Sequence, residues 1–154
     1  MARCGCGSGA CGCVVTAAAG SGITVSGSGT LGSPFLLNFV FTVWANITGT
    51  YVNSFSAYTG TAADVPQYRT FLGGKLVQLR GRVLGTTWTP INTNMITGLP
   101  VAIRPVRTKY LAVYSDDVAG DNGQITITNA GVMVNQCTYP DTYISLDGIW
   151  YETD

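Results

Sequence analysis

The last two thirds of this chain are built from strand-forming stretches that close on turn residues, and this pattern restricts the possible folds more than any other feature. Four such stretches follow one another: GKLVQLRG at 74–81, GLPVAIRP at 98–105, QITITNAG at 124–131 and YISLDGIWY at 143–151. Alternating apolar and polar side chains are typical of a strand with one buried face. Glycine and proline at the ends indicate turns. We therefore expect a β structure.

The remainder of the C-terminal part continues the same pattern. Phe35, Leu37, Phe39, Phe41 and Val43 alternate with a second set of residues, which predicts one long strand over 35–44 with a strongly apolar face. Further strands are predicted over 75–83, 110–115, 124–128, 131–135 and 142–151.

Turn signals separate these strands. Asn129, Ala130 and Gly131 predict a tight hairpin, because Asn and Gly tolerate positive φ. Prolines at 90, 100, 105 and 140 belong to connections, since proline cannot occupy a central strand. With about seven or eight strands at this spacing and no helical period, we expect an all-β fold, a jelly-roll-like antiparallel β-sandwich.

Residues 1–33 differ in composition from the rest, because they are rich in Gly, Ser, Ala, Cys and Thr. We expect two parts: an N-terminal Cys/Gly-rich segment over 1–33 and a β-sandwich over 34–154, with the boundary at Ser33–Pro34. A flexible Gly/Ser linker is one interpretation of the first part. The strand formers around Ile23 and Val25 favour a partly ordered attachment segment instead.

The four C-terminal stretches and the Cys/Gly-rich opening together resemble phage minor tail proteins, the family that forms trimeric tail-fibre or receptor-binding tips. The resemblance implies a homotrimer located in the virion tail and assembled in the host cytoplasm. It also implies that residues 1–33 dock on other tail or virion proteins, and that the sandwich faces a glycan or protein of the host surface. A capsid-decorating or head-fibre protein with the same sandwich is the alternative interpretation.

Composition argues against several other functions. Eight basic residues balance eight acidic ones, so no electrostatic footprint for nucleic acid or an anionic membrane is present. No apolar run is long enough for a membrane-spanning helix, and we expect no membrane insertion. Histidine is absent, which excludes Ser-His-Asp and Cys-His catalysis. We expect a protein that is not an enzyme and uses no cofactor.

The low charge content, 10%, is typical either of a poorly soluble chain or of an obligate oligomer.

Cysteines form the most distinctive local pattern. Cys4, Cys6, Cys11 and Cys13 make two C-x-C pairs, and three interpretations stay open. The pairs could form disulfides within or between chains, hold zinc or an iron–sulfur centre, or remain free thiols. We expect a cross-linking staple rather than a reactive site, because such a glycine-rich segment offers almost no core. Cys137 stands apart and is expected to be a small buried hydrophobe.

Acidic residues offer weaker candidates. Asp116, Asp117, Asp121 and Asn122 share a glycine-containing loop, which predicts either a calcium site or, more simply, a solvated hairpin loop. A glycan depolymerase would need two placed carboxylates. The candidates Asp64, Asp117 and Asp147 are scattered, and Asp147 with the following glycine predicts a turn or bulge.

Ligand binding is predicted most directly by one aromatic residue in a polar stretch. Trp88 lies between threonines and is followed by Asn92 and Asn94, a composition typical of a saccharide or protein contact. The competing interpretation is that Trp88 covers the end of its own sandwich or a neighbouring subunit. Trp44 and Trp150 lie in predicted strands and are expected in the core or in a subunit interface.

Overall fold

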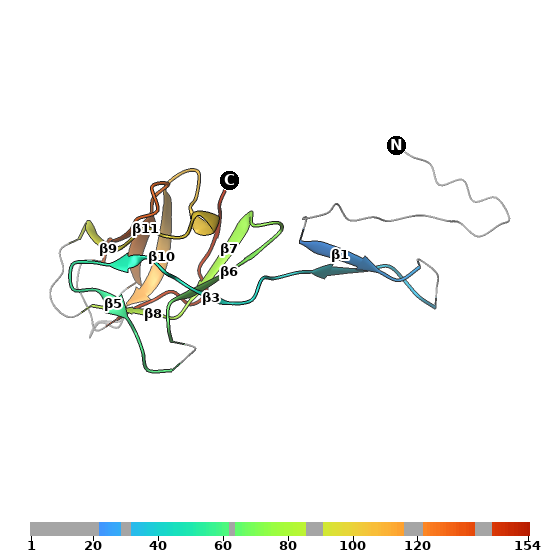
Figure 1. The fold of residues 1–154 in the computed structure, drawn as a ribbon, viewed down its shortest axis with the longest axis horizontal. Coiled ribbons are helices and arrows are strands. Elements are labelled where there is room, and N and C mark those ends of the chain that lie inside the picture. The colour runs from blue at the N-terminus through green and yellow to red at the C-terminus, as the bar shows by residue number, and fades with distance from the viewer. Residues whose placement is uncertain (1–21, 29–31, 62–63, 86–90, 116–121, 138–142) are drawn as a thin grey trace.

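The computed structural model describes residues 22–28, 32–61, 64–85, 91–115, 122–137 and 143–154. In these residues the chain forms antiparallel β-sheets and one short 3-10 turn, η1 (Val101–Ile103). No helix in this part of the chain is long and apolar enough to cross a membrane. The all-β, antiparallel prediction is confirmed (Figure 1).

Three sheets contain all the described strands. In chain order these are β1 (Ile23–Ser26), β2 (Leu36–Phe39), β3 (Ala45–Asn46), β4 (Thr50–Tyr51), β5 (Ser56–Ala57), β6 (Gln67–Phe71), β7 (Leu76–Arg80), β8 (Arg82–Leu84), β9 (Thr93–Thr97), β10 (Lys109–Ser115), β11 (Asn122–Ile127), β12 (Met133–Asn135), β13 (Tyr143–Ser145) and β14 (Trp150–Glu152). The largest sheet has the order β4-β9-β12-β11-β10-β13-β8-β5 and is nearly closed, like a barrel. The second has the order β14-β7-β6-β3, and the third is the hairpin of β1 and β2.

The two larger sheets share one core. Ile125, Ile127 and Met133 contribute to it from the eight-stranded sheet, and Val77 and Leu79 from the four-stranded sheet. All five side chains are fully buried. Burial of a side chain of this size contributes about 1.5–3 kcal/mol, so this core supplies the main stabilisation of the fold. We call the described residues from Ala45 onward the body.

Two adjacent corners carry the chain from one large sheet into the other. At Gly81, with φ of 91°, β7 of the four-stranded sheet turns into β8 of the eight-stranded sheet. At Asp147 and Gly148 the chain passes between the same sheets in the opposite sense, from β13 to β14. The backbone N–H of Gly81 donates to Oδ1 of Asp147 at 2.9 Å, and the N–H of Leu146 donates to the Gly81 carbonyl at 2.8 Å. The first and fourth sequence motifs therefore form one joint, and the predicted turn at Asp147 is confirmed. The single strands predicted over 75–83 and 142–151 are wrong, because each is divided at its corner into two strands of different sheets.

The second and third motifs meet at another point of the body. The N–H of Leu99 donates to the carbonyl of Gly131 at 2.9 Å, and Nε of Arg104 donates to the carbonyl of Leu99 at 2.7 Å. The hydroxyl of Tyr151, from the fourth motif, donates to the carbonyl of Ile103 in η1 at 2.7 Å. All four motifs thus hold the fold through contacts with one another.

The hairpin predicted at Asn129–Gly131 is also confirmed. Strands β11 and β12 pair antiparallel, with Ile127 opposite Met133. Gly131 has φ of 78°, and its N–H donates to the Thr128 carbonyl at 3.0 Å. A residue with a side chain would be strained in that conformation, which explains the glycine.

The single long strand predicted over 35–44 is wrong. Only β2 forms there, because the chain changes its hydrogen-bonding partner after Val40. The N–H of Val40 donates to the Gly22 carbonyl at 2.7 Å, whereas the N–H of Thr42 donates to the Thr70 carbonyl at 2.9 Å. Residues 40–44 therefore connect two sheets, and their apolar side chains do not line a common core.

The β1–β2 hairpin, which we call the ribbon, lies outside the body. Figure 1 shows it (blue) projecting from the end of the body where β3 and the turn between β6 and β7 lie. Ile23 pairs with Phe39, Val25 with Leu37 and Ser26 with Leu36. The ribbon thus joins residues from both sides of Ser33–Pro34.

Candidate interaction site

Several residues proposed from the sequence fall outside the described part of the chain. They are Cys4, Cys6, Cys11, Cys13, Trp88, Asp116, Asp117 and Asp121. The cysteine staple and the exposed tryptophan therefore remain predictions. Among the residues that the structure describes, no group of three or more Cys, Asp and Glu side chains is placed to hold a metal ion.

Asn92 lies just before β9 and Asn94 within it, and both are exposed. Their backbones are engaged, because the N–H of Asn92 donates to the Asn135 carbonyl at 2.8 Å and the carbonyl of Asn94 accepts from Nδ2 of Asn53 at 3.0 Å. Asn92 has φ of 66°, a conformation that asparagine tolerates better than most residues. Both asparagines therefore have a local structural role in addition to any contact with a ligand.

The remaining candidates have structural roles. Cys137 is buried in the core, as predicted, and its thiol donates to the Gln124 carbonyl at 3.6 Å. Asp64 accepts from the Thr61 hydroxyl at 2.6 Å and lies 3.6 Å from Nε of Arg82. Asp147 accepts from the N–H of Gly81. Both described aspartates of the glycosidase hypothesis thus stabilise loops or corners.

An alternating stack of aromatic rings and guanidinium groups holds the root of the ribbon on the body. Cζ of Arg69 lies 4.2 Å from the ring centroid of Phe41 and 4.7 Å from that of Trp44. Cζ of Arg80 lies 4.2 Å from the Trp44 ring. We call Phe41, Trp44, Arg69 and Arg80 the clamp. Each such contact contributes about 0.5–1 kcal/mol where it is solvent-accessible.

The clamp is reinforced on the outer face of the four-stranded sheet. Nε of Arg69 donates to Oε1 of Gln78 at 2.7 Å, and Nε of Arg80 donates to Oε1 of Gln67 at 2.8 Å. Phe71 extends the stack, with its ring centroid 4.9 Å from that of Phe41 and 5.5 Å from that of Trp150. Because the guanidinium groups have fixed partners, the clamp has a defined geometry.

The sequence prediction for Trp44 and Trp150 therefore needs revision in one respect. Trp44 lies after the ribbon, outside a strand, and Trp150 lies in β14 with its side chain exposed. Neither belongs to the core, because both face outward from the four-stranded sheet, where aromatic and guanidinium groups stack. Their expected place in a subunit interface stays a prediction.

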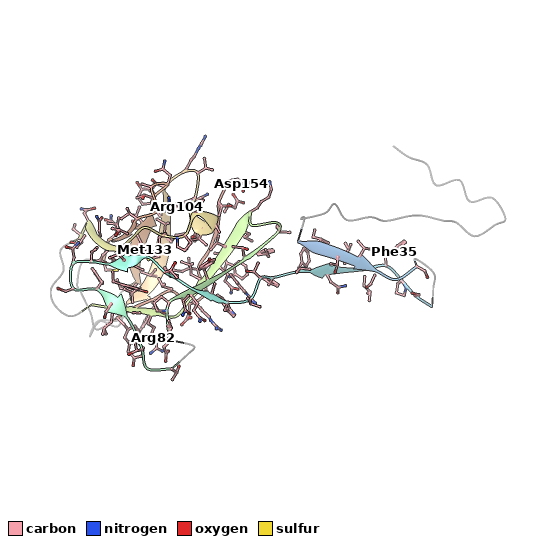
Figure 2. All side chains as sticks on the ribbon, viewed as in Figure 1. Phe35, Arg82, Arg104, Met133 and Asp154 are labelled. Atoms are coloured by element: carbon pink, nitrogen blue, oxygen red, sulfur yellow. The ribbon has the colours of Figure 1, made fainter. Side chains whose placement is uncertain are left out.

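The ribbon presents apolar side chains without a core beneath them. Leu37 is 62% exposed and Phe39 is 58% exposed. The connector beyond it leaves Val43 86% exposed. Figure 2 shows that the side chains around Phe35 belong to the ribbon alone, at a distance from the dense packing around Met133. A two-stranded hairpin by itself is only marginally stable in water, so this exposure calls for an explanation.

Charge is distributed very unevenly along the chain. Of the eight basic and eight acidic residues, only Arg3 precedes Asp64. The ribbon and the connector to the body therefore carry no charge at all. This absence of charge between Arg3 and Asp64 is visible in the sequence, and it distinguishes the ribbon from a solvated loop.

Few titrating groups are perturbed. Burial raises the pKa of Tyr51 to about 12 and raises the pKa of Tyr151 further above its usual value. The hydrogen bond from Nζ of Lys75 to Oδ2 of Asp154, at 2.9 Å, lowers the pKa of the Asp154 carboxyl and raises that of Lys75. Both partners of this pair are exposed, and solvent screening keeps its contribution small.

No protein-family model matches this chain, and no curated protein sequence matches it.

Proposed function

We propose that this chain is a structural protein of a bacteriophage tail, a minor tail protein or the tip of a tail fibre. In this proposal the N-terminal part attaches to other virion proteins, and the body is presented as a trimer to a glycan or protein of the host surface. The body is taken to be the jelly-roll-like sandwich of that family, and no reaction is assigned to it.

The resemblance of the four motifs supports the proposal, and one structural observation carries it. The chain divides into an uncharged, apolar ribbon held outside the body and a C-terminal part, from Asp64 onward, whose sequence contains fifteen of the sixteen charged residues, because only Arg3 precedes Asp64. Exposed apolar patches are typical of surfaces that other molecules cover. A charged, well-packed domain is suited to face solvent. This division suits a protein anchored at one end.

The trimer has a functional rationale in this setting. Three identical bodies on one tip multiply weak contacts with a surface through their high effective concentration. Asn92, just before β9, and Asn94, within it, are suitable for such contacts because both side chains are exposed and polar.

Immunogold labelling of purified phage particles with antibodies against the body tests the proposal. We expect labelling at the tail tip and detection of the chain in the particle by mass spectrometry. Labelling of the capsid surface would instead support the head-fibre alternative. Absence of the chain from particles would contradict a virion role.

A further inference from the structure

The ribbon has two chemically different faces. Ile23 and Val25 on β1 lie opposite Phe39 and Leu37 on β2, so these four side chains form one continuous apolar face. The other face carries Thr24, Ser26 and Asn38, with Nδ2 of Asn38 donating to the Ser26 hydroxyl at 3.4 Å, together with Leu36. An amphipathic ribbon normally packs its apolar face against a second layer about 10 Å away.

The ribbon is anchored to the body at its root, and its apolar face is only partly covered, with Leu37 and Phe39 exposed and Ile23 and Val25 half-buried. At its root, the N–H of Val40 donates to the Gly22 carbonyl at 2.7 Å, and the N–H of Thr70 donates to the Thr42 hydroxyl at 2.8 Å. A Cβ on Gly22 would lie only 2.6 Å from the backbone nitrogen of Leu72, so the two backbones are in close contact. These contacts and the clamp fix the direction of the ribbon away from the body.

The composition of the ribbon indicates what kind of surface covers it. A charged partner surface would lose its hydration against this face without gaining an ion pair, because no charged residue lies between Arg3 and Asp64. A second ribbon of the same kind has no such penalty. Its apolar face is matched in size, it carries no charge, and it is present in equal amount.

The area involved is sufficient for a contribution to assembly. Burying a side chain of this size removes on the order of 100 Å² of apolar surface from water. On this face Leu37 and Phe39 are exposed and Ile23 and Val25 are half-buried, so the face offers roughly 200–300 Å² per copy, compared with about 800 Å² per partner in a stable interface. The ribbon would provide about a third of such an interface.

We propose that the apolar face of the ribbon, formed by Ile23, Val25, Leu37 and Phe39, packs against the same face in other copies of this chain. The ribbon is then the assembly element of the oligomer, and the bodies are held side by side through it. This inference rests on the proposed trimer and names the surface that forms it.

Two substitutions in adjacent residues of β2 provide a matched test in the full chain. Leu37→Asn places an amide on the apolar face, whereas Leu36→Asn makes the same chemical change on the opposite face at almost the same exposure, 57% against 62%. Sedimentation equilibrium at micromolar concentration measures the association. We expect Leu37→Asn to weaken it at least about tenfold and Leu36→Asn to change it less than about twofold. Circular dichroism checks that the body stays folded in both variants.

The outcomes separate the inference from the proposed trimer. A monomeric wild-type chain would contradict the trimer and, with it, the inference. A wild-type trimer that neither variant weakens, or that both weaken equally, would overturn the inference alone. A photo-cross-linker in place of Phe39 gives a second measurement that does not depend on destabilising the assembly. We expect it to attach to residues 22–43 of another copy, and attachment to the body would overturn the inference.

Discussion

At the scale of single residues, several polar groups in the interior are committed to specific partners. Tyr151 is the clearest case, because its side chain is buried and its hydroxyl donates to the Ile103 carbonyl at 2.7 Å. That bond joins β14 to η1, so one phenol couples the fourth motif to the second. Ionisation of this group in place would put a charge into the core next to a carbonyl oxygen, which is costly.

One buried phenol, Tyr151, and one half-buried phenol, Tyr51, predict how stability depends on alkaline pH. The pKa of Tyr51 is raised to about 12 by burial, and burial also raises the pKa of Tyr151. A folded-state pKa above the unfolded value of 10.0 means that the contribution to stability is fully present below about pH 10 and is lost as pH rises toward the folded pKa. We therefore expect the free energy of unfolding to fall as the pH rises from about 10 toward about 12.

Phenolate absorbance measures the ionisation of the tyrosines, and urea unfolding at each pH measures the change in the free energy of unfolding. Tyr151→Phe should cost about 1 kcal/mol at neutral pH through its lost hydrogen bond, and should reduce the dependence on alkaline pH. If all the tyrosines ionise together near pH 10 while the fold remains intact, the result would contradict the claim that Tyr51 and Tyr151 are shielded from solvent.

At the scale of elements, the joint between the two large sheets depends on one glycine. Gly81 has φ of 91°, and a Cβ there would collide with the carbonyl groups of Val65 and Asp64. Gly74, in the turn after β6, has almost the same φ of 93° but open space around the Cβ position. The two glycines therefore separate backbone strain from steric conflict.

Gly74→Ala and Gly81→Ala form a matched pair for this reason. We expect Gly74→Ala to lower the free energy of unfolding by about 1–2 kcal/mol, the cost of a side chain in the left-handed region. Gly81→Ala should lower it by at least about 2 kcal/mol more, because the corner must also move. Urea unfolding monitored by circular dichroism measures both. Equal effects would contradict the close packing at the corner.

Elements with clear periodicity were predictable from the sequence, and those without it were not. β10, β11 and β12 follow their apolar alternation and turn residues closely. β3, β4 and β5 are two residues long, and a pair of residues carries no period. Their extended state comes from pairing with β6, β9 and β8, which lie far away in the sequence.

The error at residues 35–44 has a different origin. Alternation identifies an apolar face, but it does not identify the layer that covers this face. After Val40, whose N–H still bonds to Gly22, the backbone bonds to β6 through Thr42, so the period continues while the partner changes. The clamp was equally hidden, because Phe41 and Trp44 meet Arg69 and Arg80 only after the sheets have formed.

At the scale of the whole molecule, the chain combines a body with a self-contained core and a ribbon that lacks one. The low charge content of the chain suggested either poor solubility or an oligomer. The residues between Arg3 and Asp64 form one continuous uncharged stretch, and this stretch contains the ribbon. A surface of this kind is compatible with a stable virion component if assembly covers it. The proposed trimer, the proposed ribbon contact and the predicted attachment through residues 1–33 are therefore parts of one account.

A cryo-electron microscopy map of the phage particle that contains this chain tests that account most directly. We expect three copies at the tail tip, with ribbons that meet through Ile23, Val25, Leu37 and Phe39 and with bodies that face outward. A map in which the chain is monomeric, or in which the ribbon is exposed to solvent while the body is buried in the tail, would contradict it.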